Sequence, residues 1–194
     1  MKIAIIKYNA GNIQSLSFAL ERLNLDFSIT GDIEEIRKAE KVIFPGVGEA
    51  STTMKYLREH NLDRVIKDLK QPVLGICLGM QLLCSYSEEN NTTCLGVFQE
   101  KVKRFIPDGD MKVPHMGWNT VHLNESWLDK SLESRYAYFV HSYYVPVSNH
   151  TSATTNYITP FSSAMHKDNF YAVQFHPEKS AEAGEIVLKS FLRI

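Results

Sequence analysis

The sequence lacks the features of membrane, secreted and nucleic-acid-binding proteins. No apolar run approaches the roughly 20 residues that a membrane-spanning helix needs. Lys7 ends the apolar stretch at the N-terminus, so we expect no signal peptide. The formal net charge is -1, without a long block of like charge, so no strong field favours nucleic acid or an anionic membrane surface. We therefore expect a cytoplasmic protein that binds neither nucleic acid nor membrane.

Cysteine is also scarce. Cys77, Cys84 and Cys94 are odd in number and lack the spacing of metal ligands, which argues against a disulfide framework and against a metal site. Reduced thiols fit a cytosolic chain. Internal repeats, low-complexity segments and linkers are absent too. The 194 residues, 44% of them apolar, can bury one core, so residues 1–194 are predicted to form a single domain.

Strand and helix patterns alternate through the first half of the chain. Short apolar runs predict strands at 3–6, 27–29, 42–44 and 72–76. Apolar residues at helical spacing lie between these runs. Met54, Leu57 and Leu62 define one face of a predicted helix, and another helix is predicted at 78–86. This alternation predicts an α/β fold: an open, mostly parallel sheet flanked by helices.

The second half of the chain has a different pattern. Segments rich in aromatic and β-branched residues follow one another without intervening helices, which predicts local antiparallel pairing. These predicted strands are 136–140, 143–145, 162–166 and 170–175. An amphipathic helix is predicted at 182–192, at the end of the sequence. The fold class therefore includes antiparallel strands in the C-terminal half.

Cys77 lies where a predicted strand turns into a predicted helix. Gly75 and Gly79 stand two residues before and after it, and small residues there permit the tight turn of a nucleophile elbow. Such a turn presents the sulfur at the carboxyl end of the sheet, where open α/β sheets bind ligands. The dipole of the following helix stabilises a thiolate. A lone cysteine is more often a small buried apolar residue, but the flanking glycines favour a nucleophile.

A thiol nucleophile needs a base, and the base needs a group that orients it. Among seven histidines, His176 stands out because it ends an apolar strand and precedes Pro177 and Glu178. In extended backbone, the side chains of His176 and Glu178 can point the same way. A carboxylate beside a histidine fixes its tautomer and stabilises the imidazolium. We therefore predict that Cys77, His176 and Glu178 act together, although they are far apart in the sequence.

These segments resemble the class I, or triad, glutamine amidotransferases. The resemblance rests on residues 75–81 (GICLGMQ) and 175–178 (FHPE), and it extends over nearly the whole chain. Within that family the chain is most similar to the glutaminase subunits of imidazole glycerol phosphate synthase. Residues 113–119 (VPHMGWN) and 138–144 (YFVHSYY) resemble two signature segments of that branch. Residues 7–12 (KYNAGN) match its start imperfectly, since Lys7 and Asn9 stand where the family often has Asp and Gly.

The resemblance implies a role for each matching position. Cys77 would be the nucleophile, His176 the general acid and base, and Glu178 the group that orients His176. The backbone of Gly46, Val47, Gly48 and Leu78 would form the oxyanion hole. Glutamine would be held by Gln81, Glu89, Ser142 and Tyr143. A partner subunit would contact Asn12, Trp118, His141 and Lys179.

The resemblance also implies the reaction. Glutamine would be hydrolysed to glutamate and ammonia through a Cys77 thioester, with no metal or organic cofactor. Because the glutaminase fold accounts for nearly all 194 residues, another chain would use the ammonia. By resemblance that partner is a (β/α)₈-barrel cyclase of histidine biosynthesis, which makes imidazole glycerol phosphate and an aminoimidazole carboxamide ribonucleotide. Rotation of the backbone at 45–48 could switch the activity, because glycines adopt either peptide orientation at low cost.

Other hypotheses remain open from the sequence. The chain could serve another synthase, such as those of anthranilate, GMP or pyridoxal phosphate formation, because these branches share the triad. It could be a non-catalytic, amidotransferase-like regulatory module, although such a protein should have lost one of the three reactive residues. A thiol peptidase or redox sensor would leave residues 176–178 (HPE) unexplained.

Overall fold

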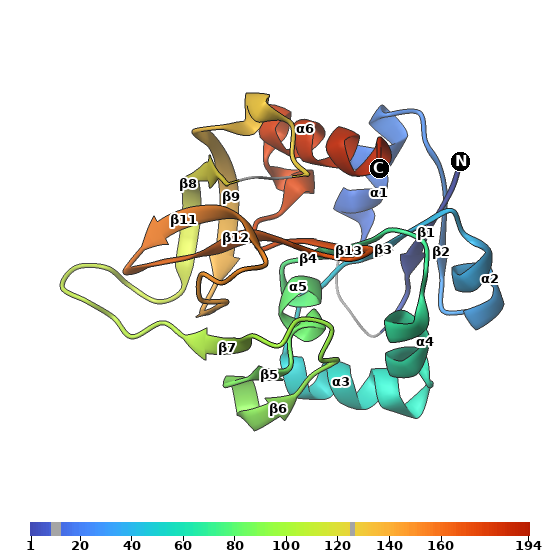
Figure 1. Ribbon diagram of the computed structural model, residues 1–194, viewed down its shortest axis with the longest axis horizontal. Helices are drawn as coiled ribbons and strands as arrows, with labels where there is room; N and C mark the ends of the chain where they lie inside the picture. The colour runs from blue at the N-terminus through green and yellow to red at the C-terminus, as the bar shows by residue number, and fades with distance from the viewer. Residues whose placement is uncertain (9–12, 125–126) are drawn as a thin grey trace.

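The computed structural model describes residues 1–8, 13–124 and 127–194, and a large mixed sheet runs through it (Figure 1). Within these residues, nine strands pair in the order β2-β1-β3-β4-β13-β12-β11-β8-β9. In that order the bounds are Asp26–Thr30, Lys2–Ile6, Lys41–Phe44, Val73–Ile76, Phe170–Val173, Thr159–Lys167, Thr151–Tyr157, His115–Leu123 and Arg135–His141. The chain therefore returns from its C-terminal half to complete the centre of the sheet.

The half of the sheet from β2 to β13 is parallel, as predicted. Its strands are almost entirely apolar because both faces are covered. In β1, for example, Ile3 and Ile5 enter one core, and Ala4 and Ile6 enter the other. Strand β13 lies beside β4, with Val173 opposite Ile76. This pairing brings the segments that follow the two strands, near residues 77 and 174, to the same edge of the sheet.

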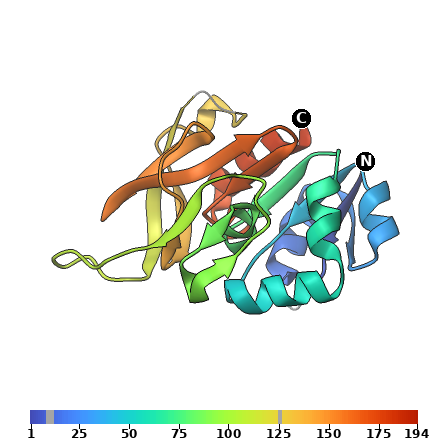
Figure 2. The same ribbon diagram turned by 60° about the horizontal axis from the view of Figure 1, so that its bottom comes forward.

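Helices cover the two faces of the sheet unequally (Figures 1 and 2). One face packs against α1 (Gln14–Arg22) and α6 (Ala181–Leu192). The other packs against α2, α3, α4 and α5, which are Ile33–Lys38, Ala50–Glu59, Leu62–Asp68 and Leu78–Leu83. Helices on both faces of a mixed sheet that is parallel in the half from β2 to β13 confirm the predicted α/β fold class.

The half of the sheet from β12 to β9 is antiparallel, as the sequence also predicted. A smaller sheet lies beside it, in the order β10-β7-β5-β6, with bounds Tyr143–Tyr144, Lys101–Arg104, Tyr86–Ser87 and Thr92–Thr93. Short 3₁₀ turns occur at η1 (Glu89–Asn91), η2 (Lys130–Leu132) and η3 (Pro177–Lys179). The connection from β7 to β8 extends away from the body of the molecule (Figures 1 and 2).

Several local predictions were wrong in extent. Met54 and Leu62 lie on two helices rather than one, because Asn61 takes a left-handed conformation with φ 57° between α3 and α4. Asparagine tolerates that conformation better than most residues do. Helix α5 ends at Leu83, and Tyr86 pairs with Thr93 in a strand instead of extending the helix. Strands β8 and β11 were not predicted, because their many polar residues obscure the strand pattern.

No helix within residues 1–8, 13–124 and 127–194 is long and apolar enough to cross a membrane.

Candidate active site

Cys77 occupies the sharp turn between β4 and α5, as predicted. Its backbone has φ 52° and ψ -109°, a region that non-glycine residues rarely adopt. The Cys77 amide donates to the Val173 carbonyl at 2.8 Å, which holds the turn against β13. A Cβ atom on Gly79 would collide with the Phe44 carbonyl oxygen, and one on Gly75 would lie 2.7 Å from Leu83 Cδ1. Close packing of the turn therefore requires glycine at 79 and favours it at 75, where the nearest atom belongs to a movable side chain. The strain at Cys77 is supported by its surroundings.

His176 reaches the same edge of the sheet from β13. Its Nδ1 lies 2.8 Å from Glu178 Oε1, so the predicted histidine–carboxylate pair is formed. The backbone around it is fixed as well: the His176 amide donates to the Tyr138 carbonyl at 3.0 Å, and the Ser180 hydroxyl donates to the His176 carbonyl at 2.6 Å. Helix α6 packs directly on this turn, because a Cβ atom on Gly184 would collide with the Pro177 carbonyl oxygen.

The electrostatic surroundings of His176 favour its protonated form. Burial alone would lower the pKa of His176, but hydrogen bonds to Cys77 and Glu178, together with their negative charges, raise this pKa to about 10. Glu178 Oε2 is buried and has no hydrogen-bond partner among the described residues, so its charge is balanced mainly by the imidazolium. Because Glu178 engages Nδ1, Nε2 is the nitrogen available to the sulfur.

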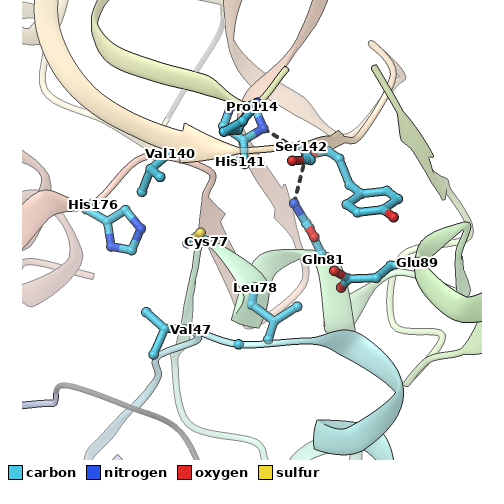
Figure 3. Close-up of a pocket in the computed structure, with 12 residues that line it drawn as sticks. Val47, Cys77, Leu78, Gln81, Glu89, Pro114, Val140, His141, Ser142 and His176 are labelled. Atoms are coloured by element: carbon cyan, nitrogen blue, oxygen red, sulfur yellow. Dashed lines mark hydrogen bonds between the residues drawn. The ribbon is translucent and has the colours of Figure 1, made fainter. Parts of the chain in front are cut away.

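A cavity of about 370 Å³ lies in front of Cys77 and His176 (Figure 3). It is lined by Val47, Gly48, Cys77, Leu78, Gln81, Glu89, Pro114, Val140, His141, Ser142, Tyr143 and His176. The predicted nucleophile and base thus face one space with all four predicted glutamine-binding residues. Glu178 lies behind His176 rather than on the wall. The volume suits a small molecule of the size of an amino acid.

The predicted oxyanion segment lies at one side of this cavity. The Leu78 amide donates to the Gly46 carbonyl at 3.4 Å, a long hydrogen bond. Gly48 has φ 113°, and a Cβ atom there would meet nothing within 4 Å. The Tyr8 hydroxyl, which the sequence did not single out, donates to the Pro45 carbonyl at 2.6 Å. The Leu78 amide is therefore already paired, and the glycine segment is anchored at Pro45 but loosely packed at Gly48.

Glu89 and Gln81 have different hydrogen-bond surroundings in the cavity. Glu89 Oε2 accepts from the Ala50 amide at 2.8 Å, at the start of α3. Burial raises the pKa of Glu89, and that hydrogen bond acts against the shift. Gln81 Nε2 donates to the Tyr143 carbonyl and to Gln174 Oε1, both at 2.9 Å. With both amide hydrogens of Gln81 engaged, its Oε1 remains to accept a hydrogen bond from a ligand.

His141 lines the cavity and contacts a second buried histidine, His115. Its Nδ1 lies 2.7 Å from the Tyr143 carbonyl, and its Nε2 lies 3.0 Å from His115 Nδ1. Burial lowers the pKa of His141 to about 3, and that of His115 to about 4. Because a carbonyl only accepts, His141 Nδ1 must carry the proton, and His115 then donates to His141 Nε2. His141 and Gln81 therefore share the Tyr143 carbonyl oxygen as acceptor. Dashed lines in Figure 3 mark hydrogen bonds from both side chains.

The residues predicted to contact a partner lie in different places. Trp118 is 53% exposed on β8, and Lys179 Nζ lies 5.8 Å from the centre of the Tyr138 ring on β9. His141 is buried, with its ring inside the cavity wall. Asn12 lies outside the described residues, as does Asn9. Exposed Met116 and Tyr136, which the sequence did not single out, lie on the same two strands as Trp118 and Tyr138.

One buried residue of the site was missed in the sequence. Gln174 is fully buried, accepts from Gln81, and has its Nε2 3.7 Å from Cys77 Sγ. Its position two residues before His176 was the available signal. In a strand, that spacing places two side chains on the same face.

Within the described ranges, no group of three or more His, Cys, Asp or Glu side chains is arranged to hold a metal ion. The three cysteines are free thiols.

Comparisons with known proteins agree with this geometry. The model of the family described as "Glutamine amidotransferase class-I" matches residues 4–194. The chain is 61% identical to a Bacteroides fragilis protein named "Imidazole glycerol phosphate synthase subunit HisH", with 100% of both chains covered. The protein of that name from Bacteroides thetaiotaomicron is 58% identical over 99% of both chains. A Campylobacter jejuni protein, "Imidazole glycerol phosphate synthase subunit HisH 2", is 45% identical, covering 100% of this chain and 98% of the relative.

Solved structures share the fold at lower identity. One described as a glutamine amidotransferase has a TM-score of 0.76 at 18% identity, covering 98% of this chain and 97% of that chain. A Thermotoga maritima glutamine amidotransferase has a TM-score of 0.61 at 16% identity, covering 100% of this chain and 83% of that chain.

Proposed function

The chain belongs to the class-I glutamine amidotransferase family, and we propose that it is the glutaminase subunit of an imidazole glycerol phosphate synthase. The observation that carries the proposal is the convergence of Cys77 and the His176–Glu178 pair on one cavity. Full-length relatives that are 58% to 61% identical favour this branch over anthranilate, GMP or pyridoxal phosphate synthesis. An intact set of reactive groups argues against a non-catalytic module. We further propose that residues 1–194 act as one domain, since the family match spans 4–194.

The first half of the reaction forms a thioester. The Cys77 thiolate attacks the carboxamide carbon of glutamine, and the carbonyl oxygen becomes an oxyanion. The raised pKa of His176 keeps its imidazole protonated at neutral pH, so it can give that proton to the leaving nitrogen. The C–N bond breaks, ammonia leaves, and a glutamyl thioester remains on Cys77.

The second half of the reaction regenerates the thiolate. His176, now neutral, takes a proton from water as the water oxygen attacks the thioester carbon. The C–S bond breaks, glutamate leaves, and the imidazolium again faces the thiolate. Glu178 holds the ring through Nδ1 in both halves, so that Nε2 serves the sulfur, ammonia and water in turn.

Substrate recognition follows from the groups on the cavity wall. Gln81 Oε1 and the Glu89 carboxylate are acceptors, which suit the amino group of glutamine. Backbone and hydroxyl groups of Ser142 and Tyr143 also line the cavity and can orient its other end. No metal or organic cofactor enters the proposed mechanism.

Stabilisation of the oxyanion requires a backbone change in this proposal. One oxyanion donor is typically worth roughly 3 kcal/mol, and the Leu78 amide now donates to the Gly46 carbonyl. Rotation of the peptide between Gly46 and Val47 would remove that carbonyl and present an N–H group in its place. The open space around Gly48 favours such a rotation. We therefore expect low glutaminase activity until a partner or ligand stabilises the rotated form.

The proposed partner surface is the exposed face of β8 and β9. Met116, Trp118 and Tyr136 are exposed large apolar side chains there, with Lys179 close to Tyr138. Aromatic residues and methionine are enriched at protein interfaces. We propose that a (β/α)₈-barrel cyclase docks on this face and receives the ammonia. Because the reaction depends on a free thiol, we place it in the reducing cytoplasm.

The test is glutamate production by the purified chain, with and without the cyclase and its ribonucleotide ligand. We expect strong stimulation by the two together and loss of activity in Cys77→Ala. Stimulation by a different synthase instead of the cyclase would assign the chain to another branch. Full activity of Cys77→Ala would refute the proposed chemistry. Labelling of Cys77 by a glutamine-like electrophile separates an enzyme from a binding module.

A further inference from the structure

The proposed mechanism uses His176 on one side of the Cys77 sulfur, but a second polar group contacts that sulfur. Gln174 Nε2 lies 3.7 Å from Cys77 Sγ, within hydrogen-bond distance for sulfur. Gln174 is fully buried, so water does not compete for this contact. Its backbone is fixed too, since its amide donates to the Ser163 carbonyl at 2.9 Å.

The orientation of the Gln174 amide is set by its neighbours. The Tyr143 carbonyl can only accept, so the Gln81 atom 2.9 Å from it must be Nε2. The second hydrogen on that nitrogen points to Gln174 and needs an acceptor, which must be Oε1. The remaining atom of the Gln174 amide, Nε2, therefore faces the sulfur. A fixed backbone carbonyl thus decides, through Gln81, that Cys77 meets a donor.

The Tyr143 carbonyl is itself held in place. It also accepts from His141 Nδ1 at 2.7 Å, and His141 is bonded to His115 at 3.0 Å. From His115 to Cys77, every residue in this chain of hydrogen bonds is at most 7% exposed apart from Tyr143, whose carbonyl is the shared acceptor. Two hydrogen bonds on one carbonyl leave it little freedom to turn away. The network therefore keeps the Gln174 donor aimed at Cys77.

We propose that the Gln174 amide is a dedicated hydrogen-bond donor to the Cys77 thiolate, held in that orientation by Gln81 and the Tyr143 carbonyl. The inference rests on the proposed function and adds a group to its nucleophile. A thiolate is a better acceptor than a thiol, so a buried donor stabilises the reactive form and restricts the sulfur to one side. His176 is the second hydrogen-bonding partner of the sulfur, so two groups together define its position.

The variants Gln174→Met and Gln174→Glu test this role in the full-length chain. Met keeps the length of the side chain and removes the donor. Glu keeps the shape and an acceptor for Gln81, but it turns a carboxyl oxygen towards the sulfur. The rate of Cys77 alkylation by iodoacetamide is followed from pH 5 to pH 10, with the Cys77 peptide quantified by mass spectrometry so that Cys84 and Cys94 do not contribute.

We expect the pH midpoint of Cys77 alkylation to rise by roughly one to two units in Gln174→Met, as for loss of a hydrogen bond to a charged group. In Gln174→Glu the rise should be larger. In both variants glutaminase kcat should fall as the alkylation midpoint rises. KM should change little because Gln174 does not line the cavity. Gln71→Met is the matched control: its amide donates to the Ile36 carbonyl, away from the site, and its midpoint should equal that of the wild type.

An unchanged midpoint in a folded Gln174 variant overturns the inference. If neither variant folds, Gln81→Met carries the test, because loss of the orienting donor should raise the midpoint in the same direction by a smaller amount. The readout is independent of the proposed function. The alkylation rate reports on the Cys77 sulfur even in a protein that does not hydrolyse glutamine. If the wild type produced no glutamate with the cyclase present, the proposed function would be refuted, but the hydrogen bond from Gln174 to Cys77 would not.

Discussion

The backbone around Cys77 and His176 is closely packed, whereas the end of the segment 45–48, at Gly48, is open. Around Cys77 and His176, added Cβ atoms on Gly75, Gly79 and Gly184 would all collide with neighbouring atoms. In the segment 45–48, Gly46 is also closely packed, since a Cβ atom there would collide with the Gly79 amide nitrogen, but Gly48 has open space around it. The hydrogen bond from the Leu78 amide to the Gly46 carbonyl is long, at 3.4 Å. The nucleophile and base are thus preorganised, whereas the backbone expected to bind the oxyanion is not. In the proposed enzyme, the nucleophile and the base would be in position before glutamine binds. A backbone change in the segment 45–48 would decide when the reaction proceeds.

The largest expected effect is a loss of activity, and it comes from a change at Cys77. Cys77→Ala removes the nucleophile, and glutaminase activity with the partner present should fall at least roughly 1,000-fold. The melting temperature should stay close to that of the wild type, because Ala fills most of the space of a buried cysteine. Cys94→Ala is the matched control and should keep full activity. Equal loss in the two variants would remove the distinction between Cys77 and the other thiols.

A pair of glycine substitutions compares the two segments directly. Gly79→Ala should destabilise the fold by about 3 kcal/mol, the upper range for overpacking, because its Cβ meets the Phe44 carbonyl. Gly48→Ala meets no atom and should cost only about 1 kcal/mol, from the positive φ. Urea unfolding of both variants gives the two values. The comparison fails if Gly48→Ala proves the more damaging to stability.

Loss of the hydrogen bond that anchors the segment 45–48 at Pro45 should have a smaller effect, and it should raise activity rather than lower it. Tyr8→Phe removes the hydrogen bond to the Pro45 carbonyl, a loss of about 1 kcal/mol in stability. Because this bond holds the segment in its present conformation, we expect partner-free glutamate production to rise severalfold, by roughly the factor that such an energy implies. Tyr56→Phe, on α3, is the control. A fall in partner-free activity would show that the anchor supports the active form instead.

Stability should also change with pH. Since the folded pKa of His176, about 10, lies above its ordinary value of 6.5, its protonation stabilises the folded state. That contribution is fully present below pH 6.5 and is lost as the pH rises towards 10. The difference in free energy of unfolding between the wild type and His176→Gln should therefore shrink across this window. Denaturant titrations at pH 6, 8 and 10 measure it, and a difference that grows with pH would contradict the assigned charge state.

Much of the firmly held side could be predicted from the sequence because its constraints are local. The glycines around Cys77 and the Pro177–Glu178 pair after His176 each encode a turn over a few residues. The loose segment was predicted as well, but its present hydrogen bond to Leu78 was not, since either peptide orientation suits glycine. Helix limits at Asn61 and Leu83 were missed because single-residue conformations and strand pairing ended those helices.

The sequence by itself determined the layered α/β fold and the kinds of reactive group, because strand periodicity, tight turns and side-chain chemistry depend on residues that are neighbours in the chain. Only the tertiary structure decided that β13 lies beside β4, which brings Gln174 to Cys77 across 97 positions of the chain. It also decided which atom of the Gln174 amide faces the sulfur. That choice depends on a carbonyl of Tyr143 and a side chain of Gln81, and hydrogen-bond direction between such distant groups exists only once the sheet has assembled.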